Sequence, residues 1–225
     1  MARIRSTVTV LALALCAGAV SALAKPPIPA VANPYGRSYA EWSAAWWTWA
    51  MEHPVAGHPF VDDASFDVTS GQSGRVWFLG APFGTAARSV TIPRGTALFV
   101  GLLNAEASDL EGLGSTTQER IDTADFLADH IVSPFCEVDG VAVRIIRSYR
   151  VTSPEFGFVA PTPWIYGATG GAGVSVADGH YVMIAPLAVG THTIHFGGAF
   201  HFSIAEGDPF DFDAALDMTY EITVE

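Results

Sequence analysis

The chain has 225 residues, of which 50% are hydrophobic and 15% are charged, and its formal net charge at pH 7 is −12. This acidity argues against a nucleic-acid-binding protein, because the surface would repel phosphate groups. The length suits a single domain with a sizeable core, and no internal repeat divides it.

The first 24 residues have the pattern of a cleavable secretory signal peptide. Arg3 and Arg5 precede an apolar run at 8–20, and the motif Ala22-x-Ala24 places small residues where a signal peptidase cuts. The run is shorter than the ~20 residues that a membrane-spanning helix needs, so no transmembrane anchor is expected in the mature form. The sequence therefore predicts a bacterial protein that is periplasmic or secreted.

Export would set the cysteine count and the charge of the mature chain. Cys16 lies in the predicted signal peptide, where it raises the alternative of a lipoprotein, and Cys136 alone cannot form an internal disulfide. The fold must then be stabilised by its core rather than by disulfides. Residues 25–225 carry nine basic and 23 acidic side chains, a formal net charge of −14. Such a surface suits neutral ligands, cations or cationic partners, or it serves solubility alone.

A tryptophan-rich helix is predicted after an extended, proline-rich lead-in at 25–36. Ser38 and Glu41 have the spacing of a capping box, and Pro54 disfavours helical geometry in the residue before it, so we expect the helix to end near residue 52. Large aromatic side chains recur along one face of this helix, at Tyr39, Trp42, Trp46 and Trp49.

This aromatic face has two interpretations. The favoured one is that it packs on a sheet, where each aromatic side chain would bury ~150–250 Å². The alternative is a stacking platform for sugar rings or a patch at a membrane interface. Trp47 lies beside the main face, so it is the tryptophan that we expect to be exposed and available to a ligand.

Most of the remaining chain reads as short strands between turns. After a loop at 54–74, we expect strands at 76–79, 89–92, 97–103, 181–185, 191–203 and 216–224. Asp139-Gly140 predicts the turn of a hairpin over 136–143 whose second arm extends toward residue 151. A long loop is predicted at 161–179, and Trp164 and Tyr166 in this loop are candidate ligand contacts.

A second helix is predicted over 117–131, with a capping box formed by Thr116 and Glu119. About eight strands and two helices define a mostly β domain over 37–225. We therefore expect an antiparallel β-sandwich or jelly-roll with a tryptophan-rich N-terminal helix and one further helix.

His195 and His201 are candidate metal ligands on a predicted strand. A bulge at Gly197-Gly198 would bring both side chains to one face. With Glu106, which follows the most apolar strand, they would form a zinc or copper site, and Glu106 and His195 are also candidate catalytic groups. The alternative is that the histidines are structural and that Glu106 is only the polar end of a buried strand.

Acidic side chains offer oxygen ligands to calcium in a loop near the C-terminus. The candidate ligands there are Asp208, Asp211 and Asp213, and a smaller group lies at Asp62, Asp63 and Asp67. Neither group matches an EF-hand loop. The alternative is a pair of solvated acidic loops.

The motif N-P-Y-G-x-S-Y-x-E-W-x-x-x-W-W-x-W extends from Asn33 to Trp49. It resembles the opening of a group of uncharacterised exported bacterial proteins, and weaker strand motifs extend this resemblance over most of the mature chain. The resemblance implies export and one domain, and it implies no activity.

Three functions remain open at this point. The first is an exported, non-catalytic binding or envelope-associated module for a neutral glycan or another small molecule, with Trp47, Trp164 and Tyr166 as contacts. The second is a metal-dependent exported enzyme with the His/Glu site. The third is a structural domain stabilised by Ca²⁺. The sequence contains no G-x-S-x-G, no H-E-x-x-H and no phosphate-binding glycine motif.

Overall fold

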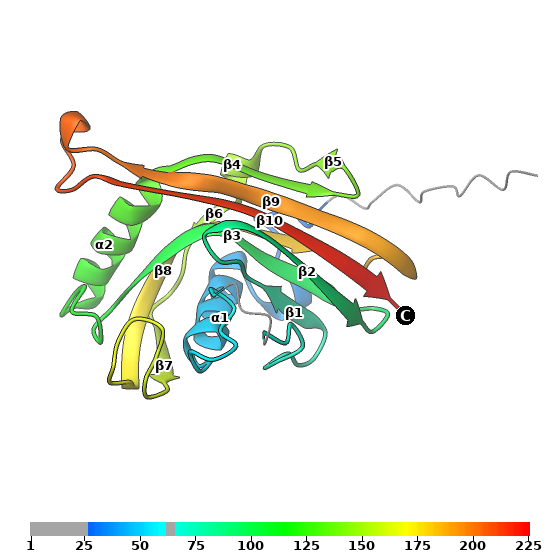
Figure 1. Cartoon of the computed structure of the whole chain (residues 1–225), viewed down its shortest axis with the longest axis horizontal. Helices are drawn as coiled ribbons and strands as arrows, with labels where there is room; N and C mark the ends of the chain where they lie inside the picture. The colour runs from blue at the N-terminus through cyan, green and yellow to red at the C-terminus, as the bar shows by residue number, and fades with distance from the viewer. Residues whose placement is uncertain (1–26, 62–65) are drawn as a thin grey trace, which may run out of the picture.

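The structure is a computed structural model, which describes residues 27–61 and 66–225. It is a sandwich of two five-stranded sheets, with one helix on the outer face of one sheet and a second helix at one end of the sandwich (Figure 1). The predicted signal peptide, together with Asp62 and Asp63, lies outside the described residues.

Sheet A has the strand order β1-β3-β8-β6, and β7 also pairs with β8. Its strands are β1 (Val76–Leu79), β3 (Ala97–Ser108), β6 (Arg150–Thr152), β7 (Phe156–Ala160) and β8 (Gly171–Ile184). β1 is parallel to β3, and the other pairs are antiparallel.

Sheet B has the strand order β2-β10-β9-β4-β5. Its strands are β2 (Gly84–Ile92), β4 (Ile131–Val138), β5 (Val141–Ala142), β9 (Gly190–Phe202) and β10 (Phe212–Val224). β2 is parallel to β10. The predicted sandwich is confirmed, but both sheets are mixed rather than antiparallel. The chain leaves sheet A after β1, adds β2 to sheet B and returns to sheet A as β3, and such crossovers allow parallel pairs.

Both helices begin where their capping boxes predict. In α1 (Tyr39–Met51) the Ser38 side chain accepts the Glu41 backbone N–H, and the Glu41 carboxylate accepts the Ser38 backbone N–H. Thr116 and Glu119 make the same exchange at the start of α2 (Thr117–Asp129). α1 lies on the face of sheet A that points away from sheet B, and α2 packs on β3 and β8 near the β9–β10 hairpin (Figure 1).

The aromatic residues of α1 are buried, as the favoured interpretation predicts. The expectation that Trp47 is exposed is wrong, because only 3% of it is accessible. Its indole N–H donates to the Tyr181 hydroxyl at 2.8 Å, and its ring meets Phe60 edge-on at 5.5 Å. The helix is thus covered both by sheet A and by the loop that follows α1.

Several strands differ from the prediction: β2 and β3 are longer, β7 was not expected, and the second arm of the hairpin ends at Ala142 instead of extending toward residue 151. The two largest differences are in β8 and β4. Residues 171–179, expected to be a loop, form the first half of β8. Their glycines reflect close packing in a strand: a Cβ on Gly179 would lie 2.4 Å from the Asn104 Cα, and one on Gly173 would lie 2.8 Å from Phe158. β4 begins at Ile131 instead of near residue 136, since its register shifts between Val132 and Phe135 and hides the strand period.

The hairpin at Asp139-Gly140 is confirmed, with β4 paired to β5 and both turn residues at positive φ. Three shorter 3-10 segments complete the described elements, at Pro34–Gly36, Ile146–Tyr149 and Ile204–Glu206. Within the described part of the chain, neither helix is long and apolar enough to cross a membrane.

Candidate functional site

A cleft lies where one edge of sheet A is uncovered. β1 pairs with β3 only from Ala97 to Val100. β3 continues to Ser108, and no strand of the described chain pairs with this edge beyond Val100. Loops and aromatic side chains border the uncovered edge instead. They enclose two adjoining pockets, which we call the Trp46 pocket and the Glu106 pocket.

The Trp46 pocket has a volume of about 260 Å³ and is lined by side chains of α1 and of both sheets. The Glu106 pocket has a volume of about 340 Å³ and extends toward α2 and the β9–β10 hairpin. The two pockets share Trp47, Phe83, Asn104, Tyr166 and Phe200, so they form one continuous aromatic cleft. Each pocket taken alone lies near the lower end of the roughly 300–1,000 Å³ typical of small-molecule sites.

Trp46 and Trp47 form the inner wall because β3 has a glycine beneath them. A Cβ on Gly101 would lie 2.6 Å from the Trp46 ring, so only glycine allows this approach. The Trp46 indole N–H donates to the Leu79 carbonyl at 2.9 Å, which ties α1 to the end of β1. The inner wall is therefore fixed by packing and by hydrogen bonds to two strands.

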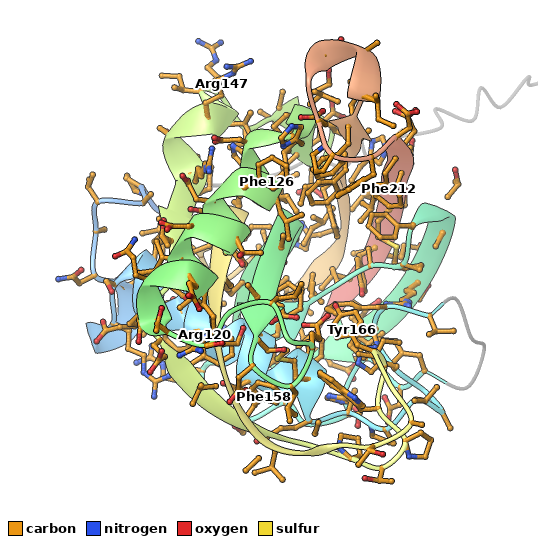
Figure 2. The ribbon with its side chains drawn as sticks, turned by 90° about the vertical axis from the view of Figure 1, so that its left-hand side faces the viewer. Arg120, Phe126, Arg147, Phe158, Tyr166 and Phe212 are labelled. Carbon is orange, nitrogen blue, oxygen red and sulfur yellow. The ribbon has the colours of Figure 1, made fainter. Side chains whose placement is uncertain are left out.

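Phenylalanines form the outer wall. The Phe202 ring centroid lies 5.0 Å from that of Phe210 and 6.0 Å from that of Phe212, and Phe83 lies 6.2 Å from Phe200. Several of these large apolar residues remain accessible, with Phe83 58% exposed, Phe212 43% and Phe210 42%. Figure 2 shows Phe126 of α2 and Phe212 of β10 on the same side of the molecule, with Tyr166 below them.

Two carboxyl groups meet on the wall of the Glu106 pocket. Glu106 is 5% exposed and accepts a hydrogen bond from the Ser175 hydroxyl at 2.5 Å. Glu111 accepts one from the Ser108 hydroxyl at 2.8 Å. Burial, together with the hydrogen bond and the charge of Glu111, holds the pKa of Glu106 well above its usual range. Glu106 therefore keeps its proton to a higher pH than an exposed glutamate does.

Tyr166 and Asn104 complete the polar part of the cleft. Tyr166 as a whole residue is 43% exposed, whereas its hydroxyl is buried. Burial, and then the charges of Glu106 and Glu111, raise the pKa of Tyr166. Its phenol thus stays a neutral donor and acceptor beside the carboxyl pair.

Three of the candidate residues from the sequence lie in the cleft: Trp47, Tyr166 and Glu106. Trp164 does not line it. It is 4% exposed, stacks on Phe158 at 5.9 Å and meets the Tyr166 ring edge-on at 5.4 Å. Trp164 therefore supports the position of Tyr166 from within the core.

The predicted transition-metal site is not formed. Glu106 points into the cleft, whereas the His195 imidazole pairs with Asp217 at 2.9 Å and that of His201 pairs with Asp213 at 2.6 Å. The expected bulge at Gly197-Gly198 is absent from the β9–β10 register, and the expectation that a bulge is needed is wrong. His195 and His201 share a face of the regular strand because they are six residues apart. That face is the outer face of sheet B, where both residues are half-buried and alternate with buried ones. His195 also lies outside the lining of the cleft, so it is no base for chemistry there.

The predicted calcium ligands are engaged with protein donors. Asp208 accepts the Ser203 backbone N–H at 2.7 Å, and Asp211 accepts that of Ile204 at 2.8 Å. Asp213 pairs with His201. These carboxylates therefore cap the turn between β9 and β10. Within residues 27–61 and 66–225, no group of three or more His, Cys, Asp or Glu side chains is placed to hold a metal ion.

Sequence reasoning missed Glu111 and the phenylalanines of the outer wall. A signal for the phenylalanines was present, since Phe200, Phe202, Phe210 and Phe212 recur with a period of two on either side of a turn. Glu111 had no comparable signal. Its position opposite Glu106 depends on the bend at residues 108–113, where the Leu113 N–H returns to the Ser108 carbonyl.

No protein-family model matches this chain, and no curated protein matches it. Among solved structures, a cysteine protease inhibitor from Entamoeba histolytica is 11% identical with a TM-score of 0.21, over 63% of this chain and 94% of that chain. The solution structure of amebosin is 10% identical with a TM-score of 0.19, over 64% of this chain and 99% of that chain. Similarity this low carries no argument about function.

Proposed function

We propose that this protein is an exported binding module that holds a small, largely apolar molecule in the aromatic cleft. The observation that carries the proposal is the cleft itself, which has two buried tryptophans at its inner wall, accessible phenylalanines at its outer wall and a few polar groups between them. Apolar walls with a small number of placed polar groups are the usual composition of a small-molecule site.

The accessible phenylalanines support the same proposal. Exposed large aromatic side chains that touch one another are uncommon on a soluble protein unless they contact something. A neutral glycan draws less support than an apolar molecule, because sugar rings stack on accessible aromatic faces and the tryptophans of α1 are buried. We therefore favour a ligand whose body is hydrocarbon or aromatic.

Binding of the neutral fluorophore N-phenyl-1-naphthylamine to the full mature chain tests the site. We expect probe emission to rise and tryptophan emission to fall, because Trp46 and Trp47 line the cleft. Ala105→Leu would occupy part of the Glu106 pocket and should weaken binding. Ala215→Leu, on the exposed face of β10, is the matched control. Equal binding by both variants, or no binding by the wild type, would contradict the proposal.

Export is the second part of the proposal, and it is supported by the sequence pattern of the first 24 residues. Expression of the whole chain in a bacterial host should release a protein that begins at Lys25. N-terminal sequencing of the periplasmic and medium fractions checks this. Recovery of the uncleaved chain in the cytoplasm would contradict export.

A further inference from the structure

We propose that the molecule held in the aromatic cleft is an organic cation, an amine or ammonium group on an apolar body, whose charged end lies against Glu106 and Glu111. This inference rests on the proposed function of the cleft and names the chemical class of its ligand. It is carried by three observations: a carboxyl pair without a basic partner in the described chain, aromatic side chains around that pair, and the negative net charge of the protein.

The carboxyl pair has no basic partner in the described chain. The arginines that form ion pairs bind elsewhere, Arg120 to Glu155 and Arg150 to Asp125, Asp129 and Asp178. Glu106 and Glu111 receive hydrogen bonds from the neutral hydroxyls of Ser175 and Ser108. A buried carboxylate normally has a cationic partner, because its transfer from water is costly. The cleft next to the pair is where such a partner would fit.

Aromatic side chains line the same pocket as the two carboxyl groups. They include Trp47, Tyr166, Phe202 and Phe212. The face of an aromatic ring attracts cations, and cages of such rings recognise ammonium groups. An anion or a neutral oxygen would gain nothing from these faces, so the walls and the carboxyl pair favour the same class of ligand.

The charge of the whole molecule has the same effect at longer range. Residues 25–225 carry a formal net charge of −14. Such a field concentrates cations near the surface and repels anions. A fatty acid, the commonest small amphiphile of opposite sign, would meet repulsion both at the surface and at the carboxyl pair.

Binding exchanges one cation for another. Before binding, Glu106 carries a proton, and an arriving ammonium group takes the place of that proton, which leaves to water or buffer. The net charge of the site is then the same before and after binding. Apart from Glu111, the titratable groups that face Glu106 are Tyr166 and Tyr181, both neutral because burial raises the pKa of each phenol. The proton therefore comes from the carboxyl pair.

A matched set of probes tests the charge of the ligand. We would measure binding of n-decylammonium, n-decanol and decanoate to the mature chain by tryptophan quenching at pH 8 and at pH 5. At pH 8 decylammonium should bind at least about tenfold more tightly than decanol, the effect of one well-placed ion pair, and decanoate should bind least. The preference for the ammonium should decrease at pH 5, because protons then compete for the carboxyl pair.

Variants distinguish this inference from the proposed function. Glu106→Gln keeps the shape of a protonated glutamate but cannot ionise, so the ratio of decylammonium affinity to decanol affinity should fall to about one, whatever the decanol affinity itself becomes. Glu221→Gln, on an exposed position of β10, is the control and should change neither. Calorimetry in two buffers of different protonation enthalpy should show proton release on decylammonium binding to the wild type and none for Glu106→Gln.

Each outcome bears on one statement. Equal affinity of the wild type for decanol and decylammonium would overturn the cationic ligand and leave the apolar cleft standing. Retained ammonium preference in Glu106→Gln would also overturn it. Failure of decylammonium and decanol alike to bind would count against the proposed function itself.

Discussion

At the scale of single residues, Glu106 combines a destabilising position with a proposed role in binding. Its carboxyl lies in the cleft wall, where burial and Glu111 favour the neutral form. In the unfolded chain it titrates near 4.5, so raising the pH above that value ionises the unfolded form before the folded one. The contribution of Glu106 to stability is thus complete below about pH 4.5 and is lost as the pH rises through its higher folded pKa.

Glu106→Gln should therefore unfold at higher urea concentration than the wild type at pH 8 and at a similar concentration at pH 4. The gain at pH 8 should exceed any difference at pH 4, because only at the higher pH does the unfolded chain gain from ionising Glu106. Glu221→Gln is again the control. Equal stability of Glu106→Gln and the wild type at both pH values would contradict the raised pKa of Glu106 in the folded protein.

At the scale of elements, α1 is tied to four different segments by its indole groups. Trp42 donates to the Pro34 carbonyl, Trp46 to that of Leu79, Trp47 to the Tyr181 hydroxyl and Trp49 to the Ser70 carbonyl. Tryptophan is therefore needed for its N–H as well as for its area. The helix holds the strands and the loops of one side of the cleft in fixed positions.

Trp46→Phe should destabilise the protein by about 1–3 kcal/mol, because the buried Leu79 carbonyl would lose its hydrogen bond and the smaller ring would leave space. Thermal and urea unfolding measure this loss. The control is Trp77→Phe in β1, a half-buried position whose indole nitrogen donates to no described residue. A loss for Trp46→Phe no larger than that for Trp77→Phe would contradict the anchoring role of the indole N–H.

The β9–β10 hairpin is held to α2 by an ion pair that depends on pH. The His130 imidazole lies 2.8 Å from the Asp208 carboxylate. Burial lowers the pKa of His130, but hydrogen bonds to the Phe126 carbonyl and to Asp208 outweigh it, so the net shift is upward from 6.5. The stabilising effect is thus complete below pH 6.5 and is lost as the pH rises through the folded pKa.

Titration of the His130 ring by NMR should give a pKa above 6.5 in the wild type. Asp208→Asn should move that pKa downward, because the negative charge is removed and the amide oxygen that replaces it is a weaker acceptor for the imidazole N–H. Asp217→Asn removes the partner of a different histidine, His195, and should leave His130 unchanged. An unchanged His130 pKa in Asp208→Asn would show that the pair does not form.

At the scale of the whole molecule, two buried histidines set the response to acid. Burial lowers the pKa of both His58 and His180 to about 4, aided by the nearby charges of His53 and Arg150 respectively. Both are therefore neutral in the folded protein and take up protons on unfolding between pH 6.5 and 4. Stability is complete above pH 6.5 and is lost as the pH falls through this window.

The unfolding free energy should fall by up to about 1.4 kcal/mol per pH unit for each of these histidines between pH 6 and pH 5. His180→Gln should remove the share of one histidine from this slope, while the opposite contribution of Glu106 in the same pH window is unchanged. Urea unfolding at the two pH values measures the slope. An undiminished slope in His180→Gln would contradict the assignment.

The parts of the fold that depend on local signals could be predicted from the sequence. The starts of α1 and α2 follow from capping boxes, and the turn at Asp139-Gly140 follows from its dipeptide. The pairing of β1 with β3 and of β2 with β10 could not be predicted, because it joins strands that local patterns treat separately. Glu106 could be recognised as a candidate from the sequence. Glu111, which helps to raise the pKa of Glu106, could not, because the bend that brings it near has no clear sequence motif.

The uncovered edge of β3 also bears on how copies of this protein behave when crowded. Exposed strand edges offer unpaired backbone groups to a neighbouring molecule, and natural sheets discourage such pairing with bulges and inward-pointing charges. β3 has such a bulge, seen as the register shift between Gly101 and Leu103. The irregularity that leaves room for a cleft in one molecule thus also discourages edge-to-edge pairing between copies.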